Sequence, residues 1–142
     1  ILRKMDTNVQ TILELLDMLP AKLHVIAAEA EALQERIAEL EQAPRAVGAI
    51  WERPSEAQGR TGNPEYTAYY ITHHRTSPYW NDDLPKDRRE RIGVGLEAKA
   101  EAEQRFADEA EYQAKKRRLS TLEMRLLRTK RELTEISRSL DA

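Results

Sequence analysis

The strongest pattern in the chain lies in its first 42 residues, 1-ILRKMDTNVQTILELLDMLPAKLHVIAAEAEALQERIAELEQ-42. Apolar side chains recur there at alternating spacings of three and four residues, at Leu2, Met5, Val9, Ile12, Leu16, Leu19, Leu23, Ile26, Ala30, Leu33, Ile37 and Leu40. Such a heptad stripe predicts an α-helix that packs along one side against another helix, as in a coiled coil. Pro20 removes one backbone hydrogen bond inside this run, and we expect a kink there, because the stripe continues past it.

The end of the chain carries a second heptad stripe, formed by Leu119, Leu122, Leu126, Thr129, Leu133, Ile136 and Leu140. We expect this second helix to begin near Asp82 or Asp83, with a frayed or separate first piece, because Gly93 and Gly95 disfavour a helix interior. Two long helices of similar length predict an antiparallel hairpin. Its assembly seam would consist of Val9, Ile12, Leu16, Leu19, Leu23, Ile26, Leu33, Ile37, Leu40, Leu119, Leu122, Leu126, Leu133, Ile136 and Leu140.

The segment between the helices has a different composition. It contains most of the prolines and glycines and six of the eight aromatic residues of the chain. We expect a small head with a short strand over residues 46–52 and a helix over 64–74, although 66–72 is also rich in strand formers. The predicted fold class is all-α, an elongated antiparallel coiled-coil hairpin with a small aromatic-rich α or α+β insert at its tip. Its parts are residues 1–43 (first helix, kinked near Pro20), 44–83 (head) and 84–142 (second helix, with a basic run at 115–131).

Composition excludes several protein classes. Of 142 residues, 34% are charged, the mean hydropathy is -0.73 and Cys is absent. The absence of Cys excludes disulfide frameworks, thiol nucleophiles and cysteine-based zinc or iron–sulfur sites. No apolar run approaches the roughly 20 residues that span a bilayer, so we expect a cytoplasmic protein with no membrane partner. The first residue is Ile, which is consistent with a true N-terminus further upstream.

The most polarised stretch is residues 115–131, where eight basic residues accompany a single acid, Glu123. Closely spaced cations on a helix can neutralise phosphates. The candidate polyanion site therefore consists of Lys115, Lys116, Arg117, Arg118, Arg125, Arg128, Lys130 and Arg131. The alternative is a solvated helix face, or charges that flank the seam. Because the acids of the first helix cluster over residues 29–41, two hairpins could also pair head to tail, with acidic and basic ends in contact.

The aromatic head is the second candidate site, because rings interleaved with cations can stack on bases or bind a protein partner. The residues assigned to it are Trp51, Tyr66, Tyr70, Tyr79, Trp80 and Arg75. The alternative is that these rings form the core of the head itself. A second, weaker basic patch follows the head, at Arg88, Arg89 and Arg91.

No catalytic motif stands out, since the sequence has no Gly-rich phosphate loop and no nucleophile beside an evident base. His73 and His74 are adjacent and no third ligand follows at a metal-like spacing, so we expect no metal and no cofactor. The sequence favours a non-catalytic coiled-coil scaffold or adaptor that binds protein partners, as a homodimer or within a larger assembly. The alternative is a nucleic-acid-binding accessory protein that uses residues 115–131 on phosphates.

Overall fold

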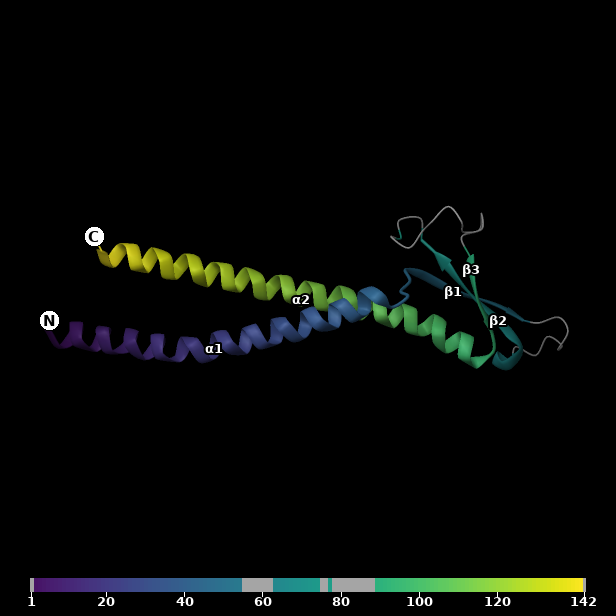
Figure 1. Ribbon diagram of the computed structural model, residues 1–142, viewed down its shortest axis with the longest axis horizontal. Coiled ribbons are helices and arrows are strands. Elements are labelled where there is room, and N and C mark those ends of the chain that lie inside the picture. The colour runs from purple at the N-terminus through teal and green to yellow at the C-terminus, as the bar shows by residue number, and fades with distance from the viewer. Residues whose placement is uncertain (1, 55–62, 75–76, 78–88, 142) are drawn as a thin grey trace. The chain divides into compact units, whose positions relative to one another are not determined.

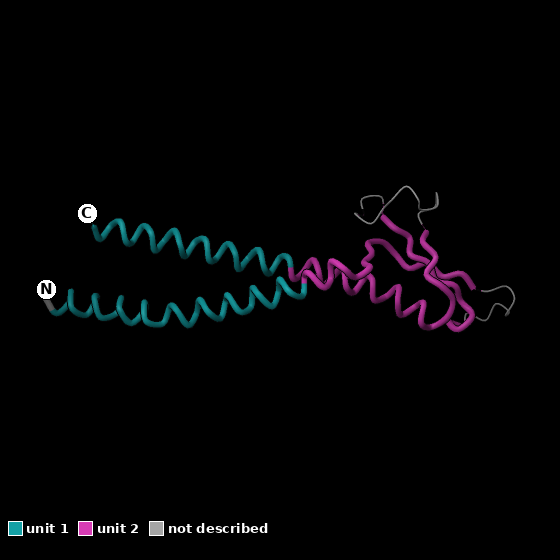
Figure 2. The backbone as a smooth tube through the Cα atoms, viewed as in Figure 1, with its two compact units in different colours: residues 1–36, 116–142 teal, residues 37–115 magenta. Residues whose placement is uncertain are grey.

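Figure 1 shows the computed structural model of the chain, which describes residues 2–54, 63–74, 77 and 89–141. The elements follow in the order α1 (Leu2–Gln42), β1 (Gly48–Pro54), the 3-10 helix η2 (Pro64–Tyr66), β2 (Thr67–His73), β3 (Arg89–Val94) and α2 (Leu96–Asp141). They form two compact units, coloured separately in Figure 2. The arm unit comprises residues 1–36 and 116–142, and the sheet unit comprises residues 37–115.

The three antiparallel strands make the fold α+β, so the prediction of an all-α hairpin is wrong. The helix predicted over 64–74 is a single 3-10 turn followed by β2, because every second residue of the sequence TAYYITH is buried and its branched and aromatic side chains suit a strand. The expected strand over 46–52 is present as β1. The predicted helix start at Asp82 or Asp83 lies outside the described residues, and α2 begins at Leu96 after β3.

Two glycines explain how the chain enters the sheet and leaves it. Gly48 begins β1 with φ 148°, and a Cβ atom there would lie 1.9 Å from the carbonyl oxygen of Thr72. Gly95 has φ 99°, donates its N–H to the carbonyl oxygen of Thr67 at 3.1 Å and accepts from the N–H of Lys99 at 3.1 Å. The left-handed φ of Gly95 therefore ends β3 and begins the first turn of α2.

The sheet is an antiparallel meander in the order β1-β2-β3. Ile50 lies opposite Ile71, and the next pair along the strands is Trp51 opposite Tyr70. Because successive side chains of a strand point to opposite sides, the sheet has two different faces. The helix-facing side holds Ile50 and Ile71, and the side that holds Trp51 and Tyr70 is called the outer face below.

The core of the sheet unit lies between the helix-facing side and α2. Ile71, Ala46 and Ala102 are buried, and Ile50, Ile92 and Phe106 pack against them. Small side chains on α2, Ala98 and Ala102, allow the helix to approach the sheet closely. Burial of a side chain such as that of Ile71 contributes about 2 kcal/mol to the free energy of unfolding.

The last residues of α1 belong to the same unit and contact α2 through polar groups. Arg45, just after α1, forms an ion pair with Glu109 at 3.4 Å, and its guanidinium lies over the ring of Tyr112, 3.8 Å from the centroid. The Tyr112 hydroxyl donates to Glu41 at 3.4 Å. Ile37 and Leu40, near the end of α1, are both buried and supply apolar packing in this part of the sheet unit.

In the arm unit, the two helices run antiparallel (Figure 1). α1 is continuous through Pro20, which lies inside the helix. Half-buried residues recur on α1 at the predicted heptad positions, including Leu19, Leu23, Ile26 and Leu33. Leu122 of α2 is fully buried, with 0% of its surface exposed. The predicted seam is therefore partly or fully buried at these positions of the arm unit.

Candidate interaction surfaces

The remainder of the predicted seam is not covered within the chain. All described residues from 3 to 18 of α1 and from 130 to 141 of α2 are exposed. We call these two segments the uncovered arms. Their heptad residues include Ile12, of which 54% is exposed, and Ile136, of which 53% is exposed. The others are Met5, Val9, Leu16, Leu133 and Leu140.

The change from covered to uncovered seam coincides with a groove in the arm unit. Figure 1 shows the two helices separating toward their N- and C-terminal ends. Where they separate, a groove of ≈ 660 Å³ is lined by residues of both helices, Leu23, Leu126, Thr129, Lys130, Leu133, Thr134, Ser137 and Arg138. Three of these lining residues, Leu23, Leu126 and Leu133, belong to the predicted seam, and only Leu23 comes from α1.

The predicted polyanion site is divided by the structure. Arg118 donates two hydrogen bonds to Glu29 of α1, and Lys115 lies 3.9 Å from Glu111 of its own helix. The hydrogen bond from Arg118 holds the pKa of the Glu29 carboxyl below its usual value, and the same contact raises the pKa of Arg118. Arg118 and Lys115 therefore have carboxylate partners inside the chain.

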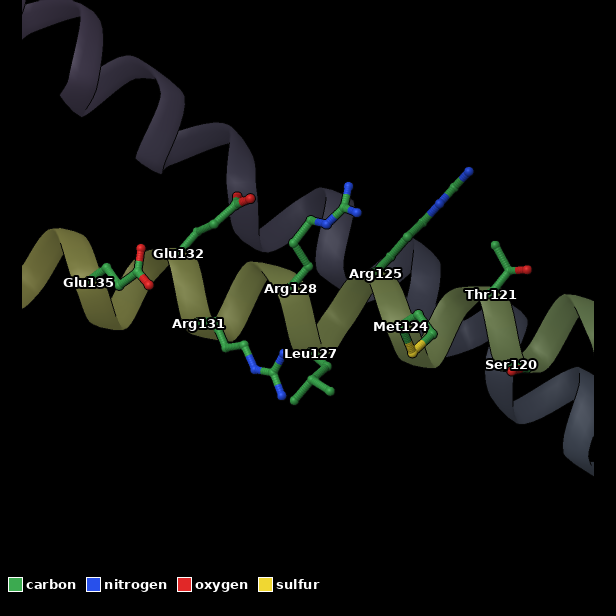
Figure 3. Close-up of a pocket in the computed structure, with 9 residues that line it drawn as sticks. All are labelled: Ser120, Thr121, Met124, Arg125, Leu127, Arg128, Arg131, Glu132 and Glu135. Carbon is green, nitrogen blue, oxygen red and sulfur yellow. The ribbon is translucent and has the colours of Figure 1, made fainter.

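Three further arginines of the basic run do not lie on one side of α2. Arg125 and Arg128 project to one side of the helix and Arg131 to the other (Figure 3). These three line a shallow hollow of ≈ 480 Å³ together with Met124, Leu127 and two acids, Glu132 and Glu135. Within the described part of the chain, Arg117, Arg128, Lys130 and Arg131 form no ion pair. The run supplies exposed cations and no concave, purely basic site.

The outer face of the sheet brings part of the predicted aromatic head together. The rings of Trp51 and Tyr70 are 5.0 Å apart between centroids, at an interplanar angle of 62°. The guanidinium of Arg89 lies over the Trp51 ring, 3.9 Å from its centroid. Tyr66 lies in η2, away from this pair in sequence and partly exposed. Tyr79, Trp80 and Arg75 lie outside the described residues.

Sequence reasoning assigned Arg89 and Arg91 to the start of a helix and to a basic patch separate from the aromatic head. In the sheet, Arg91 lies opposite Tyr70 and Arg89 opposite Thr72, so both share the outer face with Trp51. Arg53 lies opposite Ala68, two residues after Trp51 on the same strand, so it also belongs to the outer face. The spacing of two between Arg89 and Arg91 was the available signal, since it places both side chains on one side of a strand.

The helix-facing side holds a polar cluster of His73, Glu90 and Arg105. Arg105 donates to Glu90 and to Glu101, the latter at 3.2 Å. His73 is buried, its Nε2 atom is 3.8 Å from Glu90, and neither ring nitrogen has a hydrogen-bond partner. Among the residues that the structure describes, no group of three or more His, Asp or Glu side chains could hold a metal ion. The cluster therefore consists of an Arg105–Glu90 ion pair with the buried His73 ring beside it.

No protein family, curated protein or solved structure matches the chain. Neither of the described helices contains a segment that is long and apolar enough to cross a membrane.

Proposed function

We propose that the protein is a non-catalytic scaffold that self-assembles through its uncovered arms and presents the sheet unit as a recognition element. The observation that carries this proposal is the exposure of regular heptad positions, with about half of the surface of Ile12 and of Ile136 in contact with solvent. Exposed apolar patches of this regularity are uncommon on monomers, because each one forgoes the free energy of burial.

A second copy of the chain is the partner that fits the arms best. The exposed stripe of α1 continues the frame of Leu19, Leu23 and Ile26, which already pack in the arm unit. One copy exposes two such stripes at the same end of the arm unit, so a two-fold axis would bring four helical segments into one bundle. Left-handed packing of heptad stripes is the geometry that such bundles use.

The lack of a helical neighbour gives a second reason for a partner. Each uncovered arm has three or four turns with no other helix against its apolar stripe, and most helical stability in proteins comes from packing of such a face. Packing against another copy would stabilise both arms, and we therefore expect self-association and the helix content of the arms to be coupled.

The oligomeric state of the full chain tests the proposal, by size-exclusion chromatography with light scattering over a wide concentration range. We expect a dimer or larger oligomer. Ile12→Ser combined with Ile136→Ser should shift the chain to a monomer, with little change in the packing around Leu122. The matched control is Val25→Ser with Met124→Ser, which removes exposed apolar residues (68% and 64%) outside the heptad stripes. A wild-type chain that stays monomeric, or a control as disruptive as the arm variant, would contradict the proposal.

The alternative of phosphate binding by residues 115–131 has weaker support. Arg118 and Lys115 have carboxylate partners, and Glu132 and Glu135 line the same hollow as Arg128 and Arg131. Acids beside the cations reduce the attraction for a polyanion.

A further inference from the structure

The basic and acidic side chains of the described strands lie on opposite sides of the sheet. Arg53, Arg89 and Arg91 occupy outer-face positions, as their registers against Ala68, Thr72 and Tyr70 show. The acids of these strands alternate to the opposite side, where Glu90 contacts Arg105 and His73. Glu52, opposite the buried Tyr69, also belongs to that side. Within the described strands, the outer face therefore carries three cations and no acid.

The same face carries two aromatic rings in a fixed arrangement. Tyr70 meets Trp51 edge-on, and Arg89 covers the indole ring. Packing of a guanidinium on an indole fixes its orientation, and both aromatic rings and guanidinium planes are surfaces on which nucleic-acid bases stack. The centre of the outer face is thus a stacking surface with positive charge.

The two exposed arginines lie on either side of this aromatic centre. Arg53 is on β1 and Arg91 is on β3, and both residues are exposed to solvent. Two strand spacings separate β1 from β3, so the Cα atoms of these residues are on the order of 10 Å apart across the sheet. Neither forms an ion pair with a described residue. Cations on both sides of stacked rings match a polyanionic backbone whose bases point at the sheet.

We infer that the outer face of the sheet binds single-stranded nucleic acid, with Arg53 and Arg91 on phosphates and bases stacked at Tyr70 and the Trp51–Arg89 pair. A single strand fits better than a duplex, because the rings need a base whose face is not already covered by its neighbours. This inference names the partner of the recognition element in the proposed function, and it does not require the chain to self-associate.

Fluorescence anisotropy with labelled oligo-dT and oligo-U, at about 50 and 200 mM salt, tests the inference on the full chain. Arg53→Gln with Arg91→Gln should weaken binding about tenfold or more. The slope of the logarithm of the binding constant against the logarithm of salt concentration should become less steep by about 1.4, because each of two lost phosphate contacts on a single strand accounts for about 0.7. The matched control is Arg128→Gln with Arg131→Gln, which removes the same charge from α2 and should leave the affinity within about twofold. In a Trp80→Phe background, the remaining indole of Trp51 should be quenched on binding.

Several outcomes would overturn the inference. They are no binding at the lower salt, equal loss in the sheet and helix variants, unchanged fluorescence of Trp51, or a duplex of the same length bound as tightly as the single strand. Light scattering on the same samples reports the oligomeric state separately. A chain that self-associates without binding oligonucleotide therefore contradicts only this inference, and a monomer that binds contradicts only the proposed assembly.

Discussion

Glu29 of α1 and Arg118 of α2 form a bidentate ion pair, with Nε to Oε1 at 2.8 Å and Nη2 to Oε2 at 3.2 Å. The pair joins the acid-rich part of the first helix to the basic run of the second. It links the two helices of the arm unit through Arg118, a cation that the sequence analysis assigned to a polyanion site. Both side chains are solvent-exposed, so salt screens the contact.

The pH dependence of stability should carry the signature of Glu29. Because Arg118 lowers the pKa of this carboxyl in the folded chain, the pair stabilises the fold above the unfolded-state pKa, and the contribution is lost as pH falls through the folded-state value. We expect Glu29→Gln to lower the melting temperature slightly at pH 7, with the difference from wild type shrinking as pH falls through the lowered folded-state pKa of Glu29. Thermal unfolding followed by circular dichroism measures it. Glu31→Gln is the control, and an equal effect there would assign the result to net charge.

The covered part of the seam should depend on Leu122. Its side chain has 0% exposure, so Leu122→Ala leaves a cavity and should lower the free energy of unfolding by about 2–5 kcal/mol. Met124→Ala, two residues along the same helix and 64% exposed, is the comparison and should change it by less than about 0.5 kcal/mol. Urea denaturation of both variants gives the difference. Equal effects would mean that the seam is not where α2 packs.

Gly48 should not tolerate a side chain. A Cβ atom there would stand 1.9 Å from the Thr72 carbonyl oxygen, and φ is 148°. We expect Gly48→Ala to destabilise the sheet unit by more than about 2 kcal/mol, from steric overlap together with backbone strain. Hydrogen exchange of the β2 amides would report the loss. Ala49→Ser, at the exposed neighbouring position, should leave the exchange rates unchanged, and similar protection in the two variants would argue against the β1–β2 register.

His73 offers a less intuitive prediction. Its ring is buried and both nitrogens lack a hydrogen-bond partner, so His73→Leu removes a polar group without removing a hydrogen bond. Glu90 keeps its contact with Arg105 in this variant. We expect the free energy of unfolding to stay within about 1 kcal/mol of wild type, or to rise. A loss greater than about 2 kcal/mol in denaturant titrations would show that the imidazole makes a stabilising polar contact.

Only the first of the three strands was predicted from the sequence, and the reasons can be identified. Residues 64–66 resemble a capped helix start, and this start does form, with Asn63 accepting from the N–H of Glu65, but it ends after one turn. Gly93 and Gly95 were read as defects in a helix, although they lie at the end of a strand and in the turn that follows it. Strand pairing depends on partners distant in sequence, so local propensity could not decide between these structures.

The sequence by itself determined the two long helices, because a 3.5-residue repeat of apolar side chains is a local property that needs only one helical partner to be satisfied. It also located the aromatic and basic residues from which the candidate surfaces are built. Only the tertiary structure decided which of them act together. It paired Arg118 with Glu29, placed Trp51 beside Tyr70 and Arg89, and left Ile12 and Ile136 exposed. The physical reason is that such contacts depend on strand register and on where two helices separate, which are long-range properties of the packed chain.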